Sequence, residues 1–437
     1  MRQRVQTASL GRWVDPAVAY AALCGDDDGA FWLDSGPGAV SGMSYLGRAS
    51  RIVSEFEAGV LPWLRAALAA ADIDTSDAPA GFALGWVGWL GYEVRGETMG
   101  VPVRESRYPL AAFLSVERAL AFDHAAQTVT LLALADVEGY REEVLAALAV
   151  AAPLPVASAG PGEVSWRYTD EQYLSMIADC QTAIDAGDAY QLCLTTEVSV
   201  SSRPSPLGTY LALRGASPTH HGALLRASGV SVLSASPERF LAVSPEGVVT
   251  TSPIKGTRPR GVTADDDAAL RAELESSEKE QAENLMIVDL MRNDIARVAK
   301  LGTVAVTSLL AVESYAQVHQ LVSTVQGELA DALTAVDAIE ACFPAGSMTG
   351  APKLSATQIL DRIEQRARGI YSGAFGYLGF DGAMDLAMVI RTIIIDAEGT
   401  TIGTGGGITA LSVPAEELAE ARLKAEVLLR VLGADRK

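Results

Sequence analysis

Two segments in the second half of the sequence each carry a pair of glutamates spaced three residues apart. The segments, at 278–294 and 415–426, are expected to be helices, so each pair lies on one helical face. The four residues are Glu280, Glu283, Glu417 and Glu420. Either pair alone is typical of a solvated face. Together they offer four hard oxygen ligands, enough to hold Mg²⁺ by one or two carboxylates with water completing the shell.

A glycine-rich segment and an arginine near the C-terminus are candidates for binding an anion. The segment GTGGGI at 403–408 follows an apolar stretch at 388–395 that is expected to be one strand. Consecutive glycines let backbone N–H groups approach an anion closely and form a nest. Arg391 interrupts the apolar stretch, and a buried guanidinium needs an anionic partner, either a ligand or an internal ion pair. Neither a dinucleotide-binding pattern nor a Walker A motif is present.

A second candidate anion site precedes another expected helix. The segment FPAGSMTGAPK at 343–353 leads into a helix expected over 353–365. Pro352 falls near the first turn of this helix, where proline is favoured. The preceding turn would expose N–H groups and the Thr349 hydroxyl to a ligand at the helix N-terminus.

One lysine stands in an unusual place. The segment SPIKGTRPRG at 252–261 has the prolines and glycines of a turn, yet Lys255 lies between Ile254 and Gly256 where the sequence indicates a strand. The lysine is either an ordinary surface residue or an amine with a chemical role.

The composition limits the class of protein. The chain has 437 residues, of which 49% are hydrophobic, enough for a substantial core in two or three domains or one composite domain. Its net charge of −20 argues against nucleic acid or an anionic membrane as the partner. An anionic substrate would therefore need a locally positive site.

Cysteine usage and one proline-rich segment indicate location and organisation. Four scattered cysteines, without a C-x-x-C motif or a secretory signal, predict reduced thiols in the cytoplasm and neither a zinc site nor a disulfide framework. The uncharged run at 144–162 is broken by Pro153 and Pro155, which makes it a poor membrane span. We interpret it as a helix end and a linker between an N-terminal structural or regulatory-like region, 1–160, and a region with the dense motifs, 161–437.

The motifs of the second region resemble those of the chorismate-utilising enzymes, a family that includes anthranilate synthase component I, aminodeoxychorismate synthase component I, isochorismate synthase and salicylate synthase. The resemblance covers about 165–437 and is carried by SPERF, PIKGTRPRG, AENLMIVDLMRND, GSMTGAPK, GAFGYLGF, VIRT and GTGGGI. The N-terminal region matches loosely, mainly through FWLDSG at 31–36, which resembles a small-molecule pocket of the anthranilate branch. The resemblance implies an α+β, anthranilate synthase component I-like fold, with two packed, mainly antiparallel sheets and outer helices.

The resemblance also implies roles for the candidate residues. The residues that would bind chorismate are Gly256, Thr257, Gln320, Thr349, Tyr371, Arg391, Gly405, Gly406, Gly407 and Lys424. Mg²⁺ would bridge Glu283 and Glu420 to a substrate carboxylate, while Glu280 and Glu417 support it through water. Glu238, in SPERF, would be the acid/base that protonates the departing hydroxyl. These cations and N–H groups would act at short range, where they outweigh a screened net charge.

Two positions predict the reaction. Isochorismate and salicylate synthases have a water-activating lysine where this chain has Gln191, and glutamine has no useful basicity. Anthranilate synthases have PIAGT where this chain has PIKGT, so Lys255 is similar to the lysine of the aminodeoxychorismate synthases, which make the precursor of 4-aminobenzoate for folate. The lysine would add at C2, expel the C4 hydroxyl and leave when ammonia attacks C4. A nearby Mg²⁺ and arginine should favour its neutral, nucleophilic form.

Two alternatives stay open. One keeps the family but changes the product to anthranilate or 2-amino-2-deoxyisochorismate. The other is a non-catalytic chorismate-binding regulatory protein, because many anthranilate synthases have a catalytic histidine where this chain has Gln320. His319 lies one residue earlier, and a shift of one residue on a strand turns a side chain to the other face, so His319 is not expected to take that role.

The source of ammonia and the regulation are also predicted. The sequence contains no nucleophile-elbow cysteine with a downstream histidine pair, so a separate glutamine amidotransferase subunit is expected to supply ammonia. The segment SPTHHG at 217–222 differs from the family segment that helps to wall a tryptophan pocket, which argues against regulation by tryptophan. Adjacent residues point apart on a strand, so His220 and His221 are not expected to form a metal site.

Overall fold

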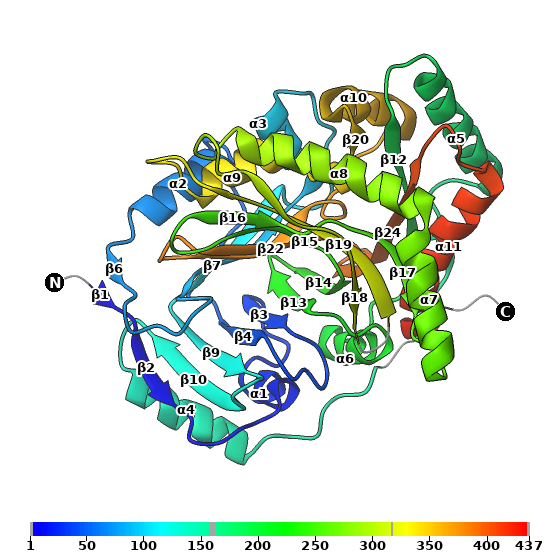
Figure 1. The fold of residues 1–437 in the computed structure, drawn as a ribbon. Helices are drawn as coiled ribbons and strands as arrows, with labels where there is room; N and C mark the ends of the chain where they lie inside the picture. Colours follow the sequence, from blue (N-terminus) through cyan, green and yellow to red (C-terminus); the bar gives the residue numbers. More distant parts are fainter. Residues whose placement is uncertain (1–2, 158–161, 316–317, 435–437) are drawn as a thin grey trace.

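Two large sheets packed against each other form the centre of the molecule, and helices lie outside them (Figure 1). The computed structural model describes residues 3–157, 162–315 and 318–434. One core cluster joins the facing sides of the two sheets, since it contains Phe31 of the first sheet and Trp89 and Phe375 of the second. The arrangement confirms the predicted α+β fold with two packed, mainly antiparallel sheets.

The first sheet has 12 strands, and neighbouring strands are antiparallel. Its main order is β11-β12-β24-β23-β14-β13-β3-β4-β9-β10-β2, and β20 pairs with β12. The strands are β2 (Gln6–Ser9), β3 (Ala30–Asp34), β4 (Met43–Arg48), β9 (Arg118–Asp123), β10 (Thr128–Ala133), β11 (Val164–Trp166), β12 (Gln191–Val200), β13 (His221–Ala227), β14 (Val230–Ser236), β20 (Gly350–Ala351), β23 (Thr392–Asp396) and β24 (Gly399–Ile408).

The second sheet has 10 strands in the order β17-β19-β16-β15-β22-β21-β7-β8-β5, and β18 pairs with β19. Its strands are β5 (Arg51–Val53), β7 (Gly85–Leu90), β8 (Ala111–Val116), β15 (Arg239–Val243), β16 (Val248–Thr251), β17 (Ile254–Pro259), β18 (Ala305–Ser314), β19 (Val318–Glu328), β21 (Ala374–Gly379) and β22 (Met384–Met388). A separate short parallel pair joins β1 (Gln3–Arg4) and β6 (Ile73–Asp74).

Helices cover the outer face of each sheet. Apolar residues of α1, α4, α6 and α11 pack on the first sheet, and those of α2, α8 and α9 on the second. The α-helices are α1 (Pro16–Leu23), α2 (Val60–Ala69), α3 (Arg95–Met99), α4 (Val137–Ala149), α5 (Asp170–Asp185), α6 (Pro206–Ala216), α7 (Ala264–Ser276), α8 (Glu278–Ala296), α9 (Ala335–Cys342), α10 (Lys353–Glu364) and α11 (Pro414–Val431). Two 3-10 turns, η1 (Tyr92–Val94) and η2 (Gly346–Met348), complete the set.

The sequence predicted the three site helices correctly, but it was wrong about one strand. Helices α8, α10 and α11 lie at the three segments expected to be helical, 278–294, 353–365 and 415–426. The expected single strand at 388–395 is two strands, because β22 ends at Met388 and β23 begins at Thr392. Arg391 lies between them with a φ of 50°, a left-handed conformation that interrupts an extended strand. It therefore sits in a connection rather than inside a strand.

The two sequence regions are joined through both sheets. The predicted boundary between 160 and 161 lies outside the described residues. Strands from either side of it pair directly, β3 with β13 in the first sheet and β7 with β21 in the second. In the described part of the chain, no helix combines the length and apolar character needed to cross a membrane. All four cysteines are free and buried.

Candidate active site

Lys255 is held on edge strand β17 beside a bulge. Lys255 pairs with Leu321 of β19, whereas Thr257 pairs with Gln320, so the register shifts at Gly256. Gly256 has a φ of 71°, and a Cβ there would lie 2.6 Å from Leu274 Cδ1. Glycine is required at this point both by the backbone and by the packing of α7. The sequence expectation that Lys255 lies in a strand is confirmed.

The Lys255 amine is surrounded by carboxylates from several elements. Its Nζ lies 3.6 Å from Oε2 of Glu283 on α8, and its side chain is 18% exposed. Its positive charge also acts to lower the pKa values of Glu238, Glu280 and Glu420. The structure therefore places the predicted nucleophile 3.6 Å from one predicted metal ligand, while the predicted acid and two further ligands interact with its charge.

Glu238 lies between β14 and β15, against the η2 loop. The Ser347 hydroxyl donates a hydrogen bond to Glu238 Oε1 at 2.8 Å. Burial raises the pKa of Glu238, while the Ser347 hydrogen bond and the Lys255 charge oppose that rise. A carboxyl group that holds its proton more tightly than usual is suited to act as a general acid. Ser347 is a residue that the sequence analysis missed, although it lies in the GSMTG segment.

The predicted metal ligands lie on two helices whose start signals are visible in the sequence. The Ser277 side chain accepts from the Glu280 N–H to cap α8, and Pro414 opens α11. Burial, followed by the charge of Glu283, raises the pKa of Glu280. Burial also raises the pKa of Glu417, whose Oε1 accepts from the Ser412 hydroxyl at 2.7 Å.

The four predicted metal ligands have the oxygen donors that Mg²⁺ prefers, but they are not gathered around one point. Burial tends to raise the pKa of Glu420, but Lys424, at 2.7 Å, brings it below its usual value. Arg258 Nη1 lies 3.8 Å from Glu280 Oε1, so cations engage both helices. Among the described residues, no group of three or more histidine, cysteine, aspartate or glutamate side chains is arranged to hold a metal ion. Their hard oxygen donors match the preference of Mg²⁺, and its binding stays a prediction.

The glycine segment forms an extended strand rather than the expected nest. Gly405, Gly406 and Gly407 pair with β12 along β24, and none of them has a positive φ. The nest expectation is wrong because an anion-binding nest needs alternating backbone conformations that a strand lacks. Lys424 Nζ donates to the Gly405 carbonyl oxygen at 2.9 Å, which fixes this ammonium beside the strand.

Two glycines of β24 leave space that the side chains of Tyr371 and Gln191 occupy. A Cβ at Gly403 would lie 2.0 Å from Tyr371 Cγ, and one at Gly407 would lie 2.2 Å from Gln191 Nε2. Tyr371 is buried and burial raises the pKa of its phenol. The buried Gln191 Oε1 has no hydrogen-bond partner among the described residues. The glycines therefore let an aromatic ring and an amide lie directly on the strand.

The Arg391 side chain is partly buried. Burial lowers the pKa of its guanidinium, opposed by the charges of Tyr371 and Glu420. No hydrogen bond or ion pair of its side chain forms within the described part of the chain. This favours an external anion over the internal ion pair that the sequence left open.

Thr349 was expected to be exposed to a ligand, but the structure buries it. Its side chain is fully buried, and its hydroxyl donates to the Ala345 carbonyl oxygen at 3.1 Å. The following residues, Gly350 and Ala351, pair with β12 as strand β20 instead of forming an open turn. The expectation is wrong for this structure because pairing with β12 draws the loop inward. Contact of Thr349 with substrate stays a prediction.

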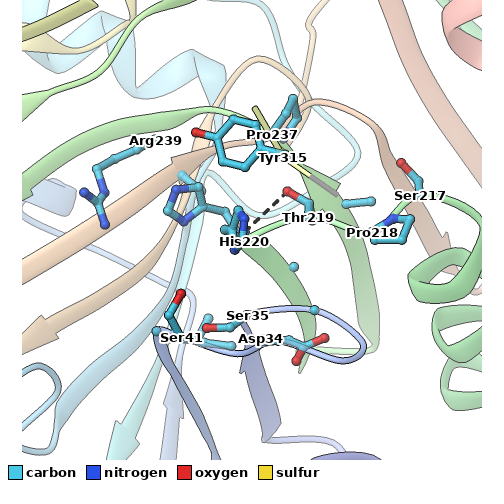
Figure 2. A pocket seen from close by; sticks show the side chains of 18 of the residues that line it. Asp34, Ser35, Ser41, Ser217, Pro218, Thr219, His220, Pro237, Arg239 and Tyr315 are labelled. Atoms are coloured by element: carbon cyan, nitrogen blue, oxygen red, sulfur yellow. Dashed lines mark hydrogen bonds between the residues drawn. The ribbon is translucent and has the colours of Figure 1, made fainter. Parts of the chain in front are cut away.

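A cavity of about 1180 Å³ opens next to these residues, and Thr257, Gln320 and Arg391 line it. Figure 2 shows another part of its lining, where Ser35 and Ser41 lie opposite His220 and Tyr315. His319 and Gln320, neighbours on β19, point to opposite faces of the strand, as expected. Gln320 lines the cavity, whereas the His319 side chain contacts Ser314 and Asp267. Its Nδ1 lies 2.8 Å from Ser314 Oγ and its Nε2 3.0 Å from Asp267 Oδ1.

The sequence matches one protein family and several individual proteins. A family model described as chorismate binding enzyme matches residues 28–430. Aminodeoxychorismate synthase from Streptomyces griseus is 41% identical over 99% of this chain and 64% of its own length. Anthranilate synthase component 1 from Streptomyces coelicolor is 36% identical over 95% of this chain and 86% of its own length. The chain thus spans less than two thirds of the Streptomyces griseus protein.

Solved structures share the fold. Anthranilate synthase component I from Streptococcus pneumoniae superposes with a TM-score of 0.77 and 27% identity, covering 96% of this chain and 98% of that chain. The menaquinone-specific isochorismate synthase from Escherichia coli superposes with a TM-score of 0.76 and 18% identity, covering 98% of this chain and 94% of that chain. At this identity the likeness shows a shared fold alone. With a family match over most of its length, this chain belongs to the chorismate-binding enzymes.

Proposed function

We propose that this chain aminates chorismate at C4 to give 4-amino-4-deoxychorismate, as an aminodeoxychorismate synthase component I. The observation that carries the proposal is the partly buried Lys255 amine, 3.6 Å from Glu283 and within the electrostatic reach of Glu238. An amine held next to a proton donor can serve as a nucleophile while the donor assists the leaving group.

Lys255 and Glu238 would act together in the first displacement. The neutral Lys255 amine forms a bond to C2, the two ring double bonds shift, and the C4–O bond breaks. Glu238 gives its proton to the departing hydroxyl, which leaves as water. Ammonia then forms a bond to C4, the double bonds shift back, and the C2–N bond to Lys255 breaks. Nitrogen is thereby placed para to the ring carboxylate.

Arg391 and Lys424 would hold the substrate carboxylates. The Arg391 guanidinium makes no hydrogen bond or ion pair within the described residues, and Lys424 is fixed on the Gly405 carbonyl oxygen. A bidentate arginine and a point-charge lysine are complementary ways to bind a carboxylate. Thr257 and Gln320 line the adjoining cavity, where the ring would lie.

Mg²⁺ and ammonia complete the proposal. Glu283 and Glu420 would hold Mg²⁺, with Glu280 and Glu417 acting through water, and the ion would supply positive charge for a substrate carboxylate. A glutamine amidotransferase partner would supply ammonia. The free, buried cysteines are consistent with the proposed cytoplasmic location.

Product analysis tests the proposal. The chain is incubated with chorismate, MgCl₂ and ammonium chloride, and the products are separated by chromatography against authentic standards. We expect a product that aminodeoxychorismate lyase converts to 4-aminobenzoate, and none without ammonium. Anthranilate or 2-amino-2-deoxyisochorismate would show amination at C2 instead. Binding of chorismate without turnover, even with an amidotransferase partner, would favour the non-catalytic alternative.

A further inference from the structure

A buried arginine lies behind the candidate substrate wall and uses every hydrogen-bond donor it has. Arg368 is 2% exposed and follows α10. Its Nε and Nη2 donate to the two carboxylate oxygens of Glu364 at 2.9 and 2.7 Å. The fork of an arginine fits a carboxylate in this bidentate way, and Glu364 neutralises the charge that burial would otherwise penalise.

The remaining donors of Arg368 reach three separate segments. Nη1 donates to the Met348 carbonyl oxygen at 2.7 Å and to the Ser372 hydroxyl at 3.4 Å. Nη2 also donates to the Cys193 carbonyl oxygen at 2.9 Å. With the two bonds to Glu364, all five guanidinium N–H groups have an acceptor.

Each of these acceptor residues is a neighbour of a candidate substrate residue, either along the chain or across a strand pair. Met348 precedes Thr349, and Ser372 follows Tyr371. Cys193 pairs with Gly407 across the β12–β24 ladder. Arg368 thus ties the η2 loop, the Tyr371 turn and strand β12 to one planar group, without itself lining the cavity.

Glu364 extends the same cross-link along β12. Its Oε1 accepts from both the backbone N–H and the hydroxyl of Thr195, each at 2.9 Å. Thr195 pairs with Gly405, the residue whose carbonyl oxygen holds Lys424. Glu93 accepts from the backbone N–H of Arg368 at 2.9 Å, which anchors the arginine from the N-terminal region.

We propose that Arg368 is a positioning residue for chorismate: with Glu364 it fixes the distances between Thr349, Tyr371 and the β24 glycines so that they match the substrate carboxylates. The proposal rests on the proposed function only in taking chorismate as the ligand. It does not depend on which ring carbon is aminated. The planar fork is essential, because an ammonium group has three donors and cannot serve all the acceptors at once.

The chain offers a matched control in Arg95. Arg95 is also a buried arginine that pairs with a carboxylate of α10, since its Nη2 lies 2.9 Å from Asp361 Oδ1. Both guanidinium groups lie over the Tyr92 ring, at 5.2 Å for Arg95 and 4.4 Å for Arg368. The hydrogen bond of Arg95 goes to Asp361, which lies on none of the three segments. Replacing Arg95 therefore shows how much the loss of a buried ion pair, by itself, changes chorismate binding and stability.

The test compares Arg368→Lys with Arg95→Lys in the full chain. We expect the Kd for chorismate, measured by isothermal titration calorimetry, to rise about tenfold or more in Arg368→Lys and less than about twofold in Arg95→Lys. Hydrogen exchange of peptides covering 346–350 and 192–196 should accelerate only in the first variant. Thermal unfolding of both variants shows how much of any effect is general destabilisation.

Equal Kd values and equal exchange in the two variants would overturn the proposal. If Arg368→Lys does not fold, Glu364→Gln is measured in the same way, because it keeps the shape but removes the charge that orients Arg368. Product identity in the unmodified chain is a separate readout, so C2 amination contradicts the proposed function while leaving the Kd comparison valid. A chain that does not bind chorismate at all contradicts both.

Discussion

Lys255 on β17 and Glu283 on α8 form an ion pair across the candidate site, with 3.6 Å between Nζ and Oε2. The residue proposed as nucleophile is thus held by a residue proposed as a metal ligand. This contact restrains the position of the Lys255 amine. Engagement of Glu283 elsewhere would release the amine.

Replacing Glu283 by glutamine should make Lys255 more reactive. Loss of the carboxylate removes the contact that holds the Lys255 Nζ, so the amine meets a reagent more easily. We expect acetylation of Lys255 by acetic anhydride, followed by peptide mass spectrometry near neutral pH, to become about two- to fivefold faster. Glu417→Gln is the control, because Glu417 bonds to Ser412 instead. Unchanged labelling in Glu283→Gln would contradict the restraint.

Ser347→Ala should move the pH profile of amination to higher pH. The Ser347 hydroxyl stabilises the ionised Glu238 and so lowers its pKa. A general acid must be protonated, and activity falls as pH rises through its pKa. Removing the hydrogen bond raises the pKa, so the descending limb of kcat/KM should shift upward.

The profile is measured at constant free ammonia, because the fraction of ammonium present as free ammonia also changes with pH. Ser355→Ala serves as the control, since its hydroxyl donates to the exposed Asp188 carbonyl oxygen instead. A limb that shifts downward in Ser347→Ala, or stays in place, would exclude Glu238 as the acid.

Gly403→Ala should damage both stability and substrate binding. The new Cβ would lie 2.0 Å from Tyr371 Cγ and must push the ring away from β24. Overpacking of a buried site costs about 1–3 kcal/mol, and here it also moves a proposed substrate residue. Gly215→Ala on α6, where no atom lies within 4 Å of the new Cβ, should unfold at the urea concentration of the parent chain or slightly above it. Equal midpoints for the two variants would contradict this packing.

Replacing Gln320 should weaken substrate binding, whereas replacing its neighbour His319 should lower the stability of the fold. Gln320 lines the cavity, so Gln320→Ala should raise the KM for chorismate about tenfold through loss of a hydrogen bond to a charged ligand. His319 is buried between Ser314 and Asp267, and His319→Ala should lower the free energy of unfolding by about 1–3 kcal/mol with KM little changed. Steady-state kinetics and urea unfolding measure both. A catalytic role for His319 would appear as a large fall in kcat.

Local patterns predicted the elements that carry the site better than the site itself. The helices with the four glutamates and the strand with Lys255 lie at the segments where the sequence analysis expected them. Arg391 was placed inside a strand because apolar residues flank it on both sides, and its left-handed backbone leaves no local signal in the sequence. The GTGGGI segment indicated close backbone approach correctly, but a strand provides that as readily as a turn does.

The remaining features depend on contacts between distant residues. Thr349 is buried because β20 pairs with β12, more than a hundred residues earlier in the chain. Arg368 meets Met348, Ser372 and Cys193 only after three elements have packed, so no spacing in the sequence indicates its role. The choice of C4 over C2 came from the resemblance around Lys255, because the types and positions of the other residues suit either product.

The most direct test of the account is whether the Lys255 amine becomes bonded to the substrate ring. The chain is mixed with chorismate and Mg²⁺ without ammonium, quenched in acid and analysed by peptide mass spectrometry, alongside Lys255→Ala. We predict that the Lys255 peptide gains the mass of chorismate less one water, and that Lys255→Ala gains nothing and forms no 4-amino-4-deoxychorismate when ammonium is added. An unmodified Lys255 peptide, together with C4 amination by Lys255→Ala at the parent rate, would contradict the account.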